Sequence, residues 1–556
     1  IAPENDDSKH ISILCSICQQ KIYPYHLLYH KMTHKALTLL GFESLQTQTD
    51  NKTLLAKRQK LISKLTKIPK CSETHRQKID NSFEFLMDSH APASHCDLAS
   101  ISNPSTFKKI NNSLIKALAI CQDKNSTWQG DMEDRFIVLD NYGNRSDTCF
   151  LGLLDGSHGA TAAETVAAEL PLLFLDQLAQ TDSSYKTTKD EQQILDSFAT
   201  VINADYREKE KIFSDRLSND NTKTNTYEWI HKAYALSFWR MDRLLRLGRN
   251  EVSKVRWSGC SAVTCLVERV DSEEADGTKE EEEKHCETTT HSPLARTARG
   301  AGLLHIANIG NAHAVLCKNG KSHCLSKEHS TSNVSERKRV LRGGGHISTN
   351  EPDGLVEGYL RTTRALGHHG DPVLKRSVIP VPHTLSVPID DTCQFLILAS
   401  NGLWEVLDYN EVLALTLTTF THYLRTCECV QQKGTSPPKY HYAMPLTEDN
   451  LNDSKTIKDL HNGTESLHSN KDIFLTDSEE LRTVSPVDSK ASPQFEEETK
   501  TYPSNCKSET AEKGRVTSET LYDNAASYVS EQLVQAALAA GSRDNITVLI
   551  VLLNGC

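Results

Sequence analysis

The chain has 556 residues, 62 of them basic and 73 acidic, for a net charge of −11, and 38% of its residues are apolar. This length is enough for roughly two or three average domains, but the low apolar share indicates a normal core diluted by long polar segments. The acidic balance argues against broad electrostatic binding to nucleic acid, and the lack of any run of about 18 apolar residues predicts no membrane-spanning helix.

The N-terminal segment, residues 1–40, contains cysteines and histidines at a spacing close to that of a C2H2 zinc finger. The four candidate ligands are Cys15, Cys18, His30 and His34. Histidines four residues apart share one face of a helix, and Cys together with His forms a tetrahedral Zn²⁺ donor set. The central segment is one residue short, so two alternatives stay open: the pair His26 and His30, or a finger-like remnant with free thiols. A lone finger favours protein contacts over sequence-specific DNA reading.

Three further zones differ from the rest in composition. Residues 41–110 are rich in Lys, Ser and Thr and are expected to form a polar linker, with a helix near Leu54–Ile68. Residues 271–298 and 431–518 are strongly polar and contain almost no aromatic side chains. Such segments cannot bury enough apolar surface to offset the entropy of ordering, so we predict two disordered inserts. The core is then expected within residues 111–555.

Several apolar runs in this region end next to Asp, Asn or Gly. The run Phe150–Leu154 leads into Asp155 and Gly156, and Phe395–Ser400 leads into Asn401. Asp544 lies just before the apolar run 546–553. Strand ends that carry carboxylates can converge on a hydrated divalent cation, because hard cations prefer oxygen ligands.

Two local patterns predict the connections of these runs. Leu303–Asn308 and Ala312–Cys317 flank a turn with glycine, which predicts a β-hairpin. The Ala-rich stretch after Gly156 predicts a helix, in which Pro171 marks a kink or break.

Eight segments resemble, in order, the motifs of the metal-dependent serine/threonine protein phosphatases of type 2C (the PPM family). They are DMED at 131–134, FLGLLDGSHGATAAETVA at 150–167, SGCSAV at 258–263, HIANIGNAHAVL at 305–316, ERKRVLRGGGHIS at 336–348, EGYLRTTRALGHHGD at 357–371, FLILASNGLWEVL at 395–407 and GSRDNITVLIV at 541–551. The resemblance implies an α/β (α+β) fold, a PPM-type four-layer αββα sandwich of two antiparallel sheets with the site at one edge.

The resemblance also implies a site for two Mg²⁺ or Mn²⁺ ions that activate a water for attack on phosphorus. The positions matching the family's metal ligands are Glu133, Asp134, Asp155, Gly156 (through its carbonyl), Asn401 and Asp544. Asn401 replaces an aspartate, and so do Asn311 and His368. We therefore expect Mg²⁺ or Mn²⁺ to bind weakly or not at all. The surviving acids are also compatible with ordinary loop hydrogen bonding.

The positions for phosphate binding and proton donation depart from the family as well. Gln129 stands where the family has the arginine that grips the phosphate, and an amide offers no charged fork. Ser157 replaces the proton-donating histidine, although His158 is adjacent. We therefore predict an impaired pseudophosphatase that binds proteins or phosphoproteins. Two alternatives are an active Mn²⁺-dependent phosphatase, with Asn401 coordinating through its carbonyl and His158 as acid, and a scaffold that uses the finger and the acidic inserts.

The 16 cysteines are scattered along the chain, and its first residues lack the charged and apolar regions of a signal peptide. This combination favours buried thiols in a reducing compartment, and hence a cytoplasmic or nuclear location.

Overall fold

The computed structural model describes most of the chain. The described ranges are 11–43, 49–65, 72–88, 104–199, 226–248, 255–269, 302–348, 354–432 and 518–556. The insert expected at 271–298 lies outside them, as does nearly all of the insert expected at 431–518.

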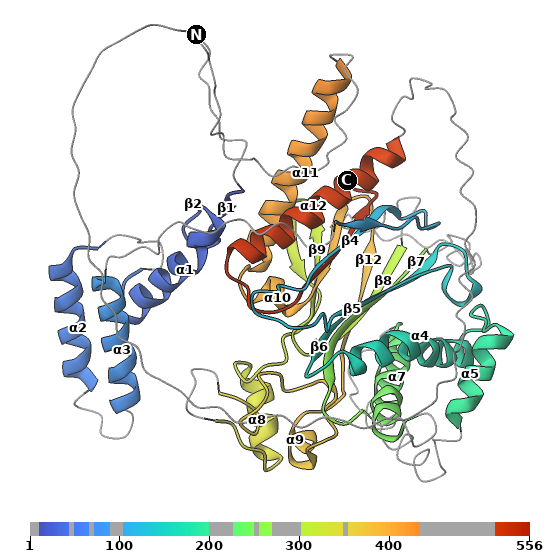
Figure 1. Cartoon of the computed structure of the whole chain (residues 1–556), viewed down its shortest axis with the longest axis horizontal. Helices are drawn as coiled ribbons and strands as arrows, with labels where there is room; N and C mark the ends of the chain where they lie inside the picture. The colour runs from blue at the N-terminus through green and yellow to red at the C-terminus, as the bar shows by residue number, and fades with distance from the viewer. Residues whose placement is uncertain are drawn as a thin grey trace, which may run out of the picture. The chain divides into compact units, whose positions relative to one another are not determined.

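Two antiparallel sheets form the centre of the fold (Figure 1). The first has the order β10-β9-β13-β14-β4-β3, with bounds Lys321–Cys324, His313–Lys318, Cys393–Ala399, Ile546–Leu553, Ile115–Asp123 and Thr106–Phe107. The second has the order β12-β8-β7-β6-β5, with bounds His383–Ile389, Gly302–Ile309, Gly259–Arg269, Thr148–Ser157 and Arg135–Asp140, and β11 (Leu366–Gly367) pairs with β7.

Strand β14 shows why these strands are apolar on both faces. Successive side chains of a strand point to opposite sides of its sheet. Leu549 belongs to the apolar cluster between the two sheets, whereas Val548 packs beneath helices α11 (Tyr409–Gln432) and α12 (Ser518–Ala539). A strand covered on both faces has a nearly continuous apolar sequence, which is the pattern that predicted this strand.

Helices cover the outer face of the second sheet in the same way. They are α4 (Thr161–Thr181), α5 (Lys189–Ala199) and α7 (Glu228–Leu247). Phe174 from α4 and Phe238 from α7 are fully buried against residues of β6, β7 and β8. Helix, sheet, sheet and helix therefore follow one another, and the predicted four-layer αββα sandwich is confirmed.

The connection between β8 and β9 differs from the prediction. The two strands do not form a hairpin, because β8 pairs with β7 and β12 in the second sheet while β9 pairs with β13 and β10 in the first. The turn crosses from one sheet to the other. Gly310 has a φ of 82°, and a Cβ there would lie 2.0 Å from Ser261 Oγ. The turn chemistry was read correctly, but turn residues alone do not fix which strands pair.

Pro171 lies inside α4, which continues through it, so the expected break is absent. Leu170 and Phe174 on either side are buried in the core, and this packing compensates for the hydrogen bond that proline cannot donate. The Pro171 carbonyl accepts a 2.5 Å hydrogen bond from the hydroxyl of Tyr142, at the start of the 3-10 turn Tyr142–Asn144.

The N-terminal segment combines a small hairpin with helices. The hairpin strands β1 (Ile13–Leu14) and β2 (Lys21–Ile22) precede α1 (Pro24–Leu39), and two further helices follow, α2 (Asn51–Leu65) and α3 (Ser72–Met87). Residues 41–110, expected to form a polar linker, thus contain two helices, and α2 includes most of the expected helix at Leu54–Ile68. Leu37 of α1 packs with Leu54 and Ile79 in a small separate cluster.

A short subdomain beside the sandwich edge completes the described fold. It contains α8 (Val334–Arg342) and α9 (Pro372–Ser377), and a four-residue helix, α10 (Asn401–Trp404), follows β13. Glu336 of α8, with a side chain only 3% exposed, accepts hydrogen bonds from Arg364, Arg339 and Thr363. No helix within the described ranges is long and apolar enough to cross a membrane.

The Glu336 cluster predicts a specific dependence of stability on pH. Burial alone would raise the pKa of the Glu336 carboxyl, but the hydrogen bonds and charge of Arg364, with Arg339, lower it to about 2. A carboxyl whose pKa falls on folding stabilises the protein above its unfolded pKa, and this contribution is lost as the pH falls toward the folded value.

Glu336→Gln is therefore expected to lower the free energy of unfolding by about 2–3 kcal/mol near neutral pH. The deficit relative to wild type should shrink as the pH falls from about 5 to about 3, as measured by urea denaturation at each pH. Glu328→Gln, at an exposed position, is the matched control. A deficit that stays constant over this range would contradict the assignment.

Candidate functional site

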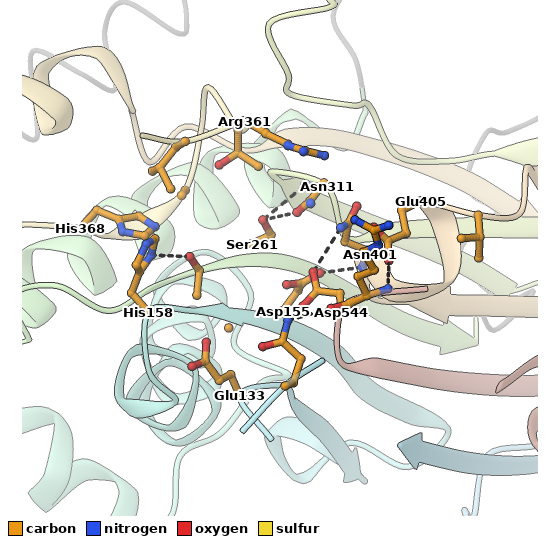
Figure 2. A pocket seen from close by; sticks show the side chains of 18 of the residues that line it. Glu133, Asp155, His158, Ser261, Asn311, Arg361, His368, Asn401, Glu405 and Asp544 are labelled. Atoms are coloured by element: carbon orange, nitrogen blue, oxygen red, sulfur yellow. Dashed lines mark hydrogen bonds between the residues drawn. The ribbon is translucent and has the colours of Figure 1, made fainter. Parts of the chain in front are cut away.

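A cavity of about 660 Å³ opens at the edge where the ends of the two sheets meet (Figure 2). Strand β6 contributes residues from the second sheet, and α10 with the segment before β14 contributes residues from the first. The cavity is lined by eight of the predicted metal, phosphate-binding and proton-donor positions, namely Gln129, Glu133, Asp155, Gly156, Ser157, His158, Asn401 and Asp544. Asn311 and His368 line it too.

The end of β6 fits tightly against the segment that carries Glu133. A Cβ on Gly156 would lie 2.3 Å from the Glu133 carbonyl oxygen, so only glycine fits there. The next turn places His158 at a φ of 60°, a left-handed conformation uncommon for a residue other than glycine. The Gly159 N–H donates a 2.9 Å hydrogen bond to Glu133 Oε1. This carboxylate thus holds the turn after β6.

Asn401 connects two carboxylates from opposite sheets. Its main-chain N–H donates to Asp155 Oδ2 at 2.6 Å, and its side-chain Nδ2 donates to Asp544 Oδ2 at 3.2 Å, as Figure 2 shows. From the sequence alone, the surviving acids were also compatible with ordinary loop hydrogen bonding. In the structure, the amide of Asn401 lies between Asp155 and Asp544.

Asp134 takes a different place from the other predicted ligands. It is 2% exposed, does not line the cavity, and accepts a 2.8 Å hydrogen bond from Thr547 Oγ1. Burial raises the pKa of Asp134 to about 7. Burial, followed by the charges of Asp134 and Asp544, raises the pKa of Asp155 well above its usual range. The site therefore carries less negative charge near neutral pH than its carboxyl groups would suggest.

Gln129, Ser157 and His158 each contact a neighbouring residue of the cavity wall. The side chain of Gln129 donates a 2.9 Å hydrogen bond to the Arg543 carbonyl. Ser157 Oγ and His158 Nδ1 are 2.8 Å apart, and the ring of His158 meets that of His368 edge to face, with 5.8 Å between centroids. Burial lowers the pKa of His368 to about 4, so this imidazole is neutral in the physiological range.

The cavity also contains two arginines that the sequence did not single out. Arg361 lies on the segment between α8 and β11, and Figure 2 shows its guanidinium above Asn311. Within the described part of the chain, Arg361 makes no ion pair or side-chain hydrogen bond. The Arg543 guanidinium lies 4.7 Å from the centroid of the Trp128 ring. Both arginines lie in motifs quoted above, but only the fold shows that they line the cavity.

The N-terminal cluster forms a second candidate site. The ligand atoms of Cys15, Cys18, His30 and His34 all lie within 4.8 Å of one another. The hairpin supplies the cysteines and α1 supplies the histidines. Cys18 Sγ lies 3.2 Å from His30 Nε2, which lies 3.1 Å from His34 Nε2. Two sulfurs and two imidazoles converging on one point suit tetrahedral Zn²⁺, and His26 is not part of this group.

Comparisons with known proteins agree with the fold and the motifs. The family model of protein phosphatase 2C matches residues 230–433. The chain is 43% identical over 561 residues to protein phosphatase 2C-like domain-containing protein 1 of Homo sapiens, covering 97% of this chain and 89% of that one. The Mus musculus protein of the same description is 38% identical, covering 98% and 88%. Protein phosphatase 1L of Bos taurus is 27% identical over 51% of this chain and 58% of its own. The chain therefore belongs to the protein phosphatase 2C family.

Members of this family generally use Mg²⁺ or Mn²⁺, and in this structure hydrogen bonds already hold the carboxylates of the cavity. Among the described residues, only the Cys/His cluster brings three or more ligand side chains close enough to share one ion. The carboxylates of the cavity do not form such a group. Their oxygens accept hydrogen bonds from Asn401, Gly159 and the N–H of Asn545. One oxygen each of Glu133 and Asp155 and both oxygens of Asp544 accept these bonds, so a divalent cation would have to share or displace nitrogen donors.

Proposed function

We propose that the chain is a pseudophosphatase, a protein phosphatase 2C fold that binds a phosphorylated protein in the cavity without turning it over. The observation that carries this proposal is the Asn401 bridge, in which hydrogen-bond donors occupy Asp155 and Asp544. A neutral amide cannot supply the Lewis acidity of a two-metal site, which activates water and offsets charge on the phosphate.

The other departures act on separate steps of the reaction. General acid catalysis contributes about 10²–10⁴-fold, and Ser157 cannot replace an imidazole in that role. Removing one electrostatic stabiliser of a transition state costs about 10²–10³-fold, and Gln129 lacks the charge of arginine. These effects are not additive, but they fall on metal binding, phosphate binding and proton donation together.

Phosphate binding is supported by the two arginines of the cavity. A guanidinium can form a charged, bidentate pair with a phosphate, and Arg361 has no competing partner among the described residues. The raised pKa of Asp155 reduces the repulsion that an incoming phosphate would meet. Arg361 and Arg543 thus provide the charge that Gln129 does not.

A second candidate is an active Mn²⁺-dependent serine/threonine phosphatase. It is favoured by His158, which lines the cavity beside Ser157 and carries an imidazole one residue from the family's acid position. In this alternative, His158 protonates the leaving group and Asn401 turns its amide oxygen toward a metal.

Turnover distinguishes the two candidates. With Mn²⁺, a phosphothreonine peptide and an aryl phosphate as substrates, the unaltered chain is expected to match its own Asp155→Ala variant. The triple variant Asn401→Asp, Gln129→Arg, Ser157→His restores the missing groups and should raise kcat/KM by about 10²-fold or more. Activity of the unaltered chain that Asp155→Ala abolishes would favour the active phosphatase.

Ligand binding tests the proposed role of Arg361. In fluorescence anisotropy, a degenerate pool of phosphothreonine peptides should bind the chain, whereas the same pool without phosphate should not. Inorganic phosphate should compete with the phosphorylated pool. Arg361→Gln should weaken this binding by about tenfold or more, because a charge-assisted hydrogen bond contributes about 1.5–3 kcal/mol. Arg337→Gln, at an exposed position of α8, is the control. Equal binding of both pools would contradict phosphate recognition.

For the N-terminal cluster, the proposed ligand is one Zn²⁺ held by Cys15, Cys18, His30 and His34. Cys15 and His34 are buried, and His34 Nδ1 is a buried nitrogen without a hydrogen-bond partner among the residues that the structure describes. Without a cation, two imidazole nitrogens and a sulfur would face one another within about 3.2 Å. A tetrahedral ion at their common centre satisfies all four ligands.

Cobalt substitution tests this site. One Co²⁺ per chain should produce thiolate-to-metal charge-transfer absorption together with tetrahedral visible bands. Cys18→Ser should weaken the charge-transfer band, and His34→Asn should alter the visible bands. His26→Asn, outside the cluster, should leave both unchanged. A spectrum without charge-transfer absorption would refute the zinc site.

A further inference from the structure

The N-terminal hairpin and α1 are built into the body of the protein. Ile13 of β1 and Leu27 of α1 are at most 1% exposed and belong to the same apolar cluster as residues of α11, α12 and β14. This hairpin and the first half of α1 therefore bury their apolar side chains in the phosphatase-like core.

Polar contacts fix the same segment to the loop after α10. Lys31 Nζ donates to Glu411 Oε2 at 2.5 Å and to the Val406 carbonyl at 3.0 Å. The Glu411 side chain is fully buried, so Lys31 supplies the positive charge that its carboxylate requires. Ser16 Oγ, in the turn between the two cysteines, donates to Asp408 Oδ2 at 2.5 Å.

These contacts reach the cavity itself. Leu28 of α1 lines the cavity together with Glu405 and Val406, and its Cδ1 would lie 3.2 Å from a Cβ on Gly541. Val406 is also the residue whose carbonyl accepts the hydrogen bond from Lys31. One turn of α1 thus joins the cavity wall, the buried Glu411 and, through the neighbouring His30, the metal cluster.

We propose that the segment 13–34 is a zinc-dependent wall of the phosphatase-like cavity, so that metal at the Cys/His cluster sets the shape of the cavity. This inference rests on the zinc site proposed above. The hairpin strands have only two residues each, and the four facing ligands come from the hairpin and from α1, so a metal would join the hairpin to the helix. Metal binding in such segments is coupled to folding. Loss of zinc releases the hairpin, and with it Leu28 and Lys31.

The consequence is a coupling between two sites that share no ligand. Zinc favours the arrangement in which Leu28 closes one side of the cavity, and a cavity ligand that touches this wall favours the same arrangement. By linkage, each then strengthens the binding of the other. The two-state element is the docked or released segment 13–34.

Hydrogen–deuterium exchange of the full chain tests the proposal, with zinc content measured on the same samples. Removal of zinc by a chelator should speed exchange about tenfold or more in peptides covering 403–412 and 541–545, as well as in 13–34. Adding Zn²⁺ back should restore protection. Strands β6 and β7 should keep theirs, because the proposal confines the effect to the wall and its contacts.

Two variants of α1 separate docking from metal binding. Lys31→Met should retain one zinc per chain yet show faster exchange at 403–412, because Glu411 loses its partner. Lys35→Met, exposed on the same helix, should match wild type in both measurements. A chain that holds no zinc refutes the zinc site and this inference together. Two other outcomes overturn this inference but leave the zinc site standing. In the first, zinc binds and its removal does not change exchange at 403–412 and 541–545. In the second, its removal causes loss of protection throughout β6 and β7.

Discussion

The hydrogen-bond bridge made by Asn401 is the constraint on which the cavity depends. Asp155 ends a strand of one sheet and Asp544 precedes a strand of the other, so the bridge joins the two sheets at their open edge. An amide carries no charge and cannot neutralise two carboxylates. Burial, together with the neighbouring charges of Asp134 and Asp544, raises the pKa of Asp155 well above its usual range.

This arrangement changes what the cavity can recognise. A site filled by two cations binds phosphate through the metals, whereas a site without them must use side chains. The fold supplies Arg361 from the subdomain of α8 and Arg543 from the segment before β14. Glu336 holds Arg364, three residues after Arg361, by charged hydrogen bonds, so the segment that presents Arg361 is itself anchored. A buried ion cluster outside the cavity thus holds the segment that carries Arg361, on which the proposed phosphate recognition depends.

The resemblance of eight motifs implied the layers of the fold, and the apolar runs of the sequence predicted individual strands. Strand β14 has apolar residues on both faces, and its limits match the apolar run. The predicted hairpin at Gly310 was wrong, because the residues of a tight turn do not show which sheet each flanking strand joins. The motif resemblance named Asp134 as a candidate ligand, whereas its burial beneath the cavity depends on tertiary packing that no sequence pattern shows. Arg361 was not predicted as a site residue, because its sequence context does not distinguish it from the other arginines. Only the fold shows that it lines the cavity.

In the N-terminal segment, the boundary suggested by composition differs from the boundary of the packed core. The cysteine and histidine spacing isolates residues 1–40 as a module, and the structure does bring the four ligands together. However, Leu27 is buried in the phosphatase-like core, and Leu37 of the same helix packs on α2 and α3. A small module whose apolar residues pack in a larger core has a fixed position, but it no longer has a hydrophobic core of its own. The proposed metal site would then be a structural element of the neighbouring cavity as much as of the module itself.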